Sequence, residues 1–252
     1  MSSERIRVQR DGVILVVTID NPAKLNTYDG PMLKAIAQAW ADLDADPELR
    51  AGVLTGAGQR AFCAGADIHA VASGGFSDPP YPELAENLSR KPLLAAIEGL
   101  CLGGGMMFAT GCDLRIAGES AEFGLPEARW NLPAHWLGAL ARQMLPSHVL
   151  ELALWADQRL GAVRLYEMGW LTRVVPTGRA LSEALIWAQR VAQMAPAAVR
   201  AFKELTRAAW TLPPADALAL GREQTADLIA MEDAREGPAA FAEGRPPRFR
   251  DR

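Results

Sequence analysis

The pattern of hydrophobic and polar positions switches repeatedly between short apolar runs and helical spacing. Residues 5–20 predict two strands that meet at the Asp11–Gly12 pair, which is a β-hairpin signal. Apolar side chains recur at helical spacing over 28–46 and stop before Pro47, so a helix is predicted there. Further short strands are predicted at 51–56, 91–99, 112–118 and 121–127, and further helical stretches at 64–71 and 81–90.

The order of these elements indicates a parallel sheet. Strands that alternate with helices are joined by crossovers, and such strands are buried on both faces. From Leu132 onward the pattern is helical, and residues 171–175 are the only strand predicted there. We therefore predict an α/β fold with a core over residues 1–175 and a C-terminal helical subdomain over residues 176–252.

Two glycine-rich loops precede predicted helices. The stretch Cys101–Asp113, "CLGGGMMFATGCD", predicts an apolar helix that opens with glycines and continues to Gly111. An apolar helix must be buried, and its first N–H groups then need partners that no capping side chain provides here. The other loop lies in 62–68, "FCAGADI". Because ligands bind at the carboxyl ends of parallel strands, both loops are expected to direct N–H groups at one place, as in an oxyanion hole.

Composition narrows the classes of protein. The 252 residues are 50% hydrophobic and 22% charged, which is typical of a globular protein. The net charge of −4 does not favour binding to the negatively charged backbone of a nucleic acid. The polar residues 1–12 predict no signal peptide and no membrane anchor. Three cysteines in apolar surroundings predict buried thiols in the cytoplasm, and three histidines make a metal site unexpected. Neither glycine loop matches a phosphate-loop or dinucleotide-binding motif.

Several segments, in order, resemble one family. They are "NPAKLNT" (21–27), "VLTGAGQRAFCAGADI" (53–68), the stretch 91–127 from "KPLLAAIEG" to "FGLPE", "AVRLYEMGWLTRVVP" (162–176) and the tail 231–249. With these segments the chain resembles the crotonase (enoyl-CoA hydratase/isomerase) superfamily. The resemblance implies a crotonase-like (ββα)n spiral core and a coenzyme A thioester as substrate. It implies no permanently bound cofactor, since coenzyme A enters as part of the substrate.

The resemblance also assigns roles to residues. The N–H groups of Ala66 and Gly104 match the two that bind the thioester oxygen, and Glu127 matches a catalytic glutamate of the hydratases. The second hydratase glutamate is replaced by Met107, which is expected to face the acyl group beside the oxyanion hole. Coenzyme A is implied to lie along Lys24, Leu25, Ala64, Asp67 and Ile68, and Phe241 matches a residue that contacts the coenzyme of a neighbouring subunit.

The loop after Glu127 departs from the hydratase pattern, because it lacks the usual glycines. Trp130 and Trp136 are expected either to wall the acyl pocket or to pack in the core. His135 is either a second proton carrier or a surface residue.

Three functions remain open from the sequence. The first is a lyase that hydrates a 2-enoyl-CoA with Glu127 as its single base. The second is an isomerase that converts a 3-enoyl-CoA to a 2-enoyl-CoA, and the third is a CoA-thioester binder with little catalysis. The apolar residues of the C-terminal third, together with the resemblance, predict a homotrimer or hexamer. No nucleic-acid or membrane partner is expected.

Overall fold

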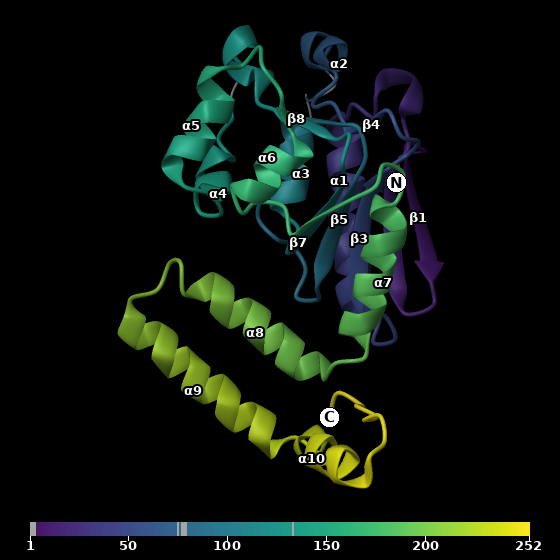
Figure 1. Cartoon of the computed structure of the whole chain (residues 1–252), viewed down its shortest axis with the longest axis vertical. Helices are drawn as coiled ribbons and strands as arrows, with labels where there is room; N and C mark the ends of the chain where they lie inside the picture. Colours follow the sequence, from purple (N-terminus) through teal and green to yellow (C-terminus); the bar gives the residue numbers. More distant parts are fainter. Residues whose placement is uncertain (1–3, 75, 77–79, 133) are drawn as a thin grey trace.

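The computed structural model describes residues 4–74, 76, 80–132 and 134–252, and two β-sheets form its core (Figure 1). The larger sheet has the strand order β1-β2-β3-β5-β7-β10, in which β1 is antiparallel to β2 and the other neighbours are parallel. Its strands are β1 (Ile6–Asp11), β2 (Ile14–Ile19), β3 (Ala51–Gly56), β5 (Leu93–Ile97), β7 (Leu114–Gly118) and β10 (Arg173–Val175). The predicted hairpin and parallel sheet are confirmed.

The smaller sheet results from a repeated strand–strand–helix unit. Each repeat sends one strand to the larger sheet and the next strand to the smaller one, so that β3 and β4, β5 and β6, and β7 and β8 form successive pairs. A helix follows each pair: α2 (Ile68–Ala72), α3 (Gly104–Thr110) and the 3-10 helix η2 (Pro126–Trp130). The smaller sheet contains β4 (Ala61–Cys63), β6 (Leu100–Leu102), β8 (Glu122–Gly124) and β9 (Leu160–Gly161). This is the predicted spiral core.

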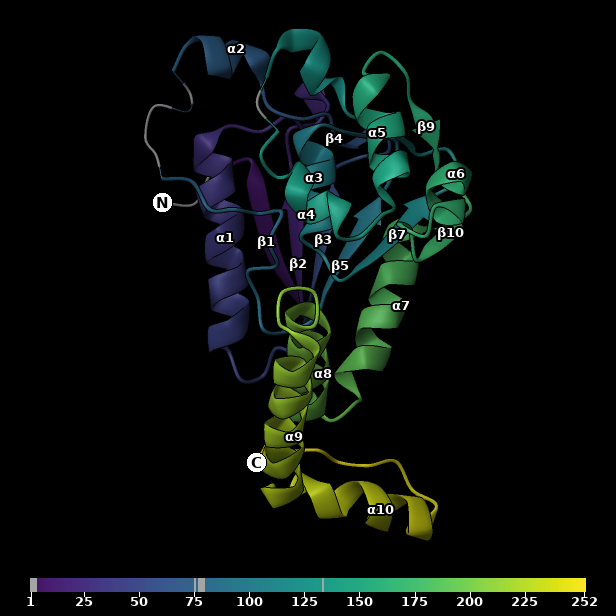
Figure 2. The same cartoon turned by 90° about the vertical axis from the view of Figure 1, so that its left-hand side faces the viewer.

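Two long helices cover the two faces of the larger sheet (Figure 2). Side chains alternate between the faces along a strand, so Leu15 and Val17 pack in the cluster that contains α1 (Gly30–Ala45). Ile14 and Val16 pack instead against Ala184 of α7 (Ala180–Ala192). The apolar strands are therefore buried on both sides, as their sequence predicts. The 3-10 helix η1 (Pro22–Lys24) precedes α1.

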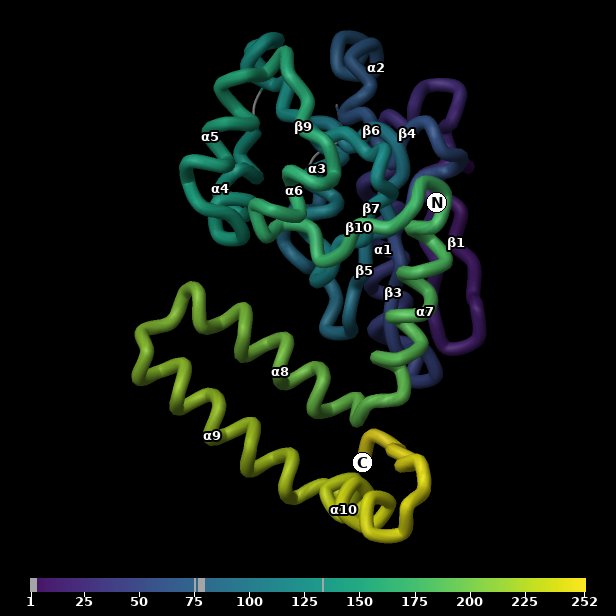
Figure 3. Tube along the Cα trace, viewed as in Figure 1, coloured from purple at the N-terminus to yellow at the C-terminus, as the bar shows by residue number. Residues whose placement is uncertain are grey.

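The remaining helices form two groups. The helices α4 (Leu137–Ala141), α5 (Pro146–Leu154) and α6 (Ala162–Glu167) lie beside α3, whereas α8 (Pro196–Ala208), α9 (Pro214–Ala230) and α10 (Asp233–Glu243) extend away from the sheets (Figure 3). The tail returns to α8 through the Arg200–Asp251 ion pair at 2.7 Å. The helical subdomain from residue 176 remains a prediction, and α7, which follows that boundary, packs on the larger sheet.

Two sequence predictions are wrong. Residues 81–90 are irregular rather than helical, because side chains take up the backbone N–H groups there. The Asp44 carboxylate accepts hydrogen bonds from the N–H groups of Arg90 and Lys91, and Asn87 accepts one from Ser89 N–H. In addition, the C-terminal half contains the two-residue strand β9, which the helical pattern concealed.

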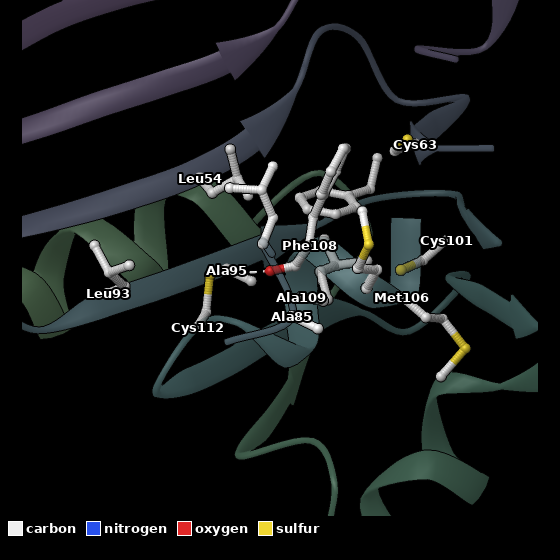
Figure 4. Packing of buried hydrophobic residues seen from close by; sticks show 14 of the residues in the cluster. Leu54, Cys63, Ala85, Leu93, Ala95, Cys101, Met106, Phe108, Ala109 and Cys112 are labelled. Carbon is white, nitrogen blue, oxygen red and sulfur yellow. Dashed lines mark hydrogen bonds between the residues drawn. The ribbon is translucent and has the colours of Figure 1, made fainter. Parts of the chain in front are cut away.

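The helix α3 lies in the centre of the larger core cluster, as its sequence requires (Figure 4). All of its residues are buried, and Met106 and Phe108 pack with Leu54 and Ala95 from the larger sheet. The three cysteines are buried free thiols, as predicted, and burial raises the pKa of Cys63 and of Cys112 to about 12. None of the described helices is both long and apolar enough to cross a lipid bilayer.

Candidate active site

A cavity of about 530 Å³ opens where α2, α3 and η2 meet. These elements follow strands of the smaller sheet, so their first residues lie at the carboxyl ends of β4, β6 and β8. In Figures 1 and 2 α2 lies at the opposite end of the molecule from α9 and α10. Twenty described residues line the cavity, and most of the side chains are aromatic or aliphatic. An apolar cavity with few polar groups is the usual form of a small-molecule site.

The two glycine loops meet in this cavity. A Cβ atom on Gly65 would lie 3.8 Å from the backbone nitrogen of Gly104, which places the two loops side by side. Tyr28 fixes the first loop, because its N–H donates to Gly65 O at 3.1 Å and its carbonyl accepts from Asp67 N at 2.8 Å. In the described part of the chain, no backbone carbonyl accepts a hydrogen bond from the N–H of Ala66 or Gly104. Both residues line the cavity and are available to an oxygen in it.

Glu127 lies directly over the second glycine loop. Gly103 has a φ of +52°, and a Cβ atom there would lie 2.7 Å from Glu127 Oε1. Only glycine combines this left-handed backbone with room for the carboxylate. Among the described residues Glu127 Oε2 has no hydrogen-bond partner although it is buried. Burial raises the pKa of Glu127 above its usual range, which suits a group that gives and takes protons.

The wall beside this carboxylate is apolar. Met107 is buried, lies on α3 and lines the cavity. The rings of Tyr28 and Phe76 stand edge to face at 6.0 Å, and those of Phe76 and Tyr81 at 5.8 Å. Trp136 is buried and Trp130 is 56% exposed, and both line the cavity. The site is thus an aromatic pocket with few ionisable groups.

The residues expected to hold coenzyme A lie together near the first glycine loop. Lys24 Nζ and Asp67 Oδ2 form an ion pair at 2.7 Å, and this hydrogen bond is the main cause of the lowered pKa of Asp67. The N–H of Ala64 donates to the carbonyl of Leu25 at 3.1 Å. Ala64 and Ile68 line the cavity, and Ile68 is exposed at its rim. An elongated ligand is therefore able to pass from the cavity along this surface.

Two further predicted residues have contrasting positions. His135 lines the cavity with a side chain that is 70% exposed, and its Nε2 is 2.7 Å from Glu83 Oε2. Phe241 lies on α10, is 90% exposed and does not line the cavity of its own chain. A role for Phe241 at coenzyme A therefore requires a neighbouring subunit.

Sequence reasoning missed Glu83 and Tyr28. Glu83 lies in the segment predicted as a helix, and its place in the cavity depends on a contact with a residue 52 positions later. Tyr28 lies before α1, and a Cβ atom on Gly104 would be 2.2 Å from its hydroxyl oxygen. Neither position carries a local sequence signal. In the described residues no three His, Cys, Asp or Glu side chains are grouped as a metal site would require.

Comparisons with known proteins agree with this architecture. Residues 9–252 match the family model "Enoyl-CoA hydratase/isomerase". The enoyl-CoA hydratase EchA19 of Mycobacterium tuberculosis is 37% identical over 97% of this chain and 96% of its own length. The carnitinyl-CoA dehydratase of Salmonella paratyphi B is 33% identical over 99% of this chain and 100% of its own length. A crystal structure of an enoyl-CoA hydratase from M. tuberculosis superposes with a TM-score of 0.90 at 31% identity, covering 99% of this chain and 100% of the other. The match over nearly the whole chain, with the crotonase fold confirmed, shows that this protein is an enzyme of the enoyl-CoA hydratase/isomerase family.

Proposed function

We propose that the protein adds water across the double bond of a 2-enoyl-CoA thioester. The observation that carries the proposal is the position of Glu127, whose unpartnered carboxylate oxygen lies in the same cavity as the N–H groups of Ala66 and Gly104. The names of similar proteins support it, because hydratases and dehydratases catalyse one reaction in opposite directions.

The reaction follows from these groups. The thioester oxygen accepts hydrogen bonds from Ala66 N–H and Gly104 N–H, while the oxygen of a water bonds to C3 of the acyl group. Negative charge then collects on the thioester oxygen as an enolate. Each well-placed donor contributes about 3–4 kcal/mol to the stability of such a transition state. Glu127 removes a proton from the water and delivers a proton to C2, which completes the addition.

Coenzyme A is proposed to leave the cavity past Ala64 and Ile68, with its adenine near Lys24, Leu25 and Asp67. The exposed Lys24 ammonium offers a charge to a phosphate, although it is shared with Asp67. Coenzyme A arrives and departs with the acyl group, and no permanently bound cofactor is needed for this chemistry.

The direct test is an absorbance assay with purified protein. With crotonyl-CoA or a longer 2-enoyl-CoA, we expect the absorbance of the conjugated thioester to fall and a 3-hydroxyacyl-CoA to appear by mass spectrometry. The panel of substrates should include acyl groups of several lengths and aromatic acyl groups, because an aromatic pocket accommodates either kind. Tight binding without turnover on the whole panel would contradict hydration and favour a CoA-thioester binder.

Isomerisation is the second candidate, and Met107 favours it. Moving a double bond from C3 to C2 needs one base that removes a proton and returns it two carbons away. A single glutamate above the apolar surface of Met107 provides this arrangement. Incubation with a 3-enoyl-CoA would then produce the conjugated absorbance without a hydroxyacyl product, so the same assay separates the two reactions.

We also propose that the protein assembles as a homotrimer or as a hexamer of two trimers. Large apolar side chains are exposed on the helices of the C-terminal half, and closed cyclic symmetry covers such surfaces. They include Leu150, Leu154, Trp155, Ile186, Phe202, Leu218, Ile229 and Phe241. Light scattering is expected to give three or six times the chain mass, and Phe241→Ala should raise the KM for the acyl-CoA. A fully active monomer would contradict this assembly.

A further inference from the structure

Two carboxylates line the cavity, and they come from different parts of the fold. Glu127 lies on η2, and Glu83 lies in the irregular segment before β5. In each, one carboxylate oxygen is buried without a hydrogen-bond partner among the described residues: Oε2 of Glu127 and Oε1 of Glu83. A buried acceptor without a partner is costly, so each oxygen is suited to a hydrogen bond from a ligand.

His135 holds the other oxygen of Glu83. Its Nε2 is 2.7 Å from Glu83 Oε2, which is a short hydrogen bond between side chains 52 residues apart. The contact fixes the carboxylate with Oε2 toward the exposed imidazole and leaves Oε1 as the buried, unpartnered atom. A carboxylate held in this way is preorganised for one further partner.

Tyr28 lines the same cavity as both carboxylates. Its hydroxyl lies against Gly104, where the thioester oxygen is expected. Burial is the main cause of the raised pKa of Tyr28, and the nearby carboxylates of Glu127 and Glu83 raise it further. The second glycine loop, the Tyr28 hydroxyl and both carboxylates therefore belong to one cavity.

We propose that Glu83 is a second catalytic carboxylate of the hydration reaction and holds the attacking water through Oε1, with His135 as its positioning residue. The inference rests on the proposed function, because it concerns the same water and the same acyl group. It assigns to Glu83 the proton-accepting work that Met107, at the position of the missing glutamate, is chemically unable to do. The second carboxylate thus comes from a segment other than α3.

The two carboxylates then divide the two proton transfers that hydration by a single carboxylate would assign to Glu127 alone: Glu83 takes the proton of the water, and Glu127 keeps the delivery to C2. The water oxygen bonds to C3 as one water proton passes to Glu83 Oε1, and the π electrons of the double bond move to the thioester enolate. The protonated form of Glu127 delivers its proton to C2 as the enolate collapses to the thioester. Exchange with solvent returns the proton from Glu83 and reprotonates Glu127. The raised pKa of Glu127 favours the protonated form that this donation requires.

The test compares two reactions in one protein. Hydration of crotonyl-CoA needs both carboxylates, whereas exchange of the C2 protons of butyryl-CoA in D₂O needs only Glu127 and the two N–H groups. For Glu83→Gln we expect kcat for hydration to fall about 10²–10⁴-fold, the usual contribution of an acid or base, while the exchange rate is unchanged. Glu86→Gln is the matched control, since Glu86 lies on the same segment, is exposed and does not line this cavity; both of its rates should be unchanged.

Variants of His135 test its positioning role. His135→Leu removes the hydrogen bond to Glu83 and should lower kcat for hydration without changing the exchange rate. His135→Gln retains an N–H donor and should restore part of that loss. A purely structural role of His135 would instead lower both rates together.

Three results would overturn the proposal for Glu83. They are unchanged hydration in Glu83→Gln, equal loss of hydration and exchange in that variant, and equal rates in the Leu and Gln variants of His135. Failure of the proposed function looks different: Glu127→Gln would then retain C2 exchange, or the wild-type protein would hydrate no enoyl-CoA. The role of Glu83 and the proposed hydratase function are therefore tested separately, because their failures affect different reactions and different variants.

Discussion

The Glu127→Gln variant is expected to hydrate enoyl-CoA about 10²–10⁴-fold more slowly than the wild type, because an amide neither accepts nor donates the proton that acid–base catalysis requires. The amide has nearly the shape of the carboxylate and fits beside Gly103, so the loop keeps its conformation. The loss should appear in kcat, measured from the fall in enoyl-thioester absorbance. KM should change less, since the N–H groups of Ala66 and Gly104 are intact.

Stability provides the control for this variant. The folded-state pKa of Glu127 is raised, so its stabilising contribution is present at low pH and is lost as pH rises through that pKa. Above that pKa the buried carboxylate is ionised at a cost, and Glu127→Gln should unfold at the same or a higher temperature than the wild type. Glu122→Gln is the matched variant, because Glu122 is exposed on β8 and pairs with Arg159. Equal loss of activity in both variants would contradict a catalytic role for Glu127.

The parts of the fold that depend on local pattern were predictable. The Asp11–Gly12 turn specifies its own hairpin, and the apolar run of β3 specifies a strand buried on both faces. The glycine run and the apolar residues behind it identified α3 and its burial. Such features are predictable because they depend only on neighbouring residues in the sequence, or on burial that is uniform along the whole helix or strand.

Elements held by distant side chains were not predictable. The segment 81–90 has a helical composition, but the Asp44 carboxylate takes the N–H groups of Arg90 and Lys91. A helix would require those residues to follow a regular backbone, and the tertiary hydrogen bonds prevent it. The same irregular path carries Glu83 to the cavity, where His135 meets it. The local sequence pattern predicts neither the hydrogen bonds to Asp44 nor the contact between Glu83 and His135, because the partners are distant in the sequence.

The candidate site was predictable in its motifs but not in its electrostatics. The resemblance located Glu127 and the two glycine loops, whereas the raised pKa of Glu127 results from burial that only the folded chain provides. Phe241 illustrates the opposite limit, because its own chain leaves it exposed and outside the lining of the cavity. Its predicted contact depends on an assembly that one chain does not contain.

The Gly105→Ala variant is expected to lose stability, because α3 packs on β4 without room for a side chain. A Cβ atom on Gly105 would lie 2.1 Å from the backbone carbonyl oxygen of Cys63, so one element must move. Overpacking of this kind costs about 1–3 kcal/mol, and a backbone obstacle places the cost at the upper end. The movement would also shift Gly104 N–H away from Ala66 N–H, so the rate of hydration should fall together with stability.

Urea unfolding measures the loss of stability, and Gly138→Ala is the control variant, since Gly138 is a helical glycine with nothing within 4 Å of the added carbon. That substitution should be neutral or stabilising by up to about 1 kcal/mol, and equal stability of the two variants would show that α3 has room to move away from β4.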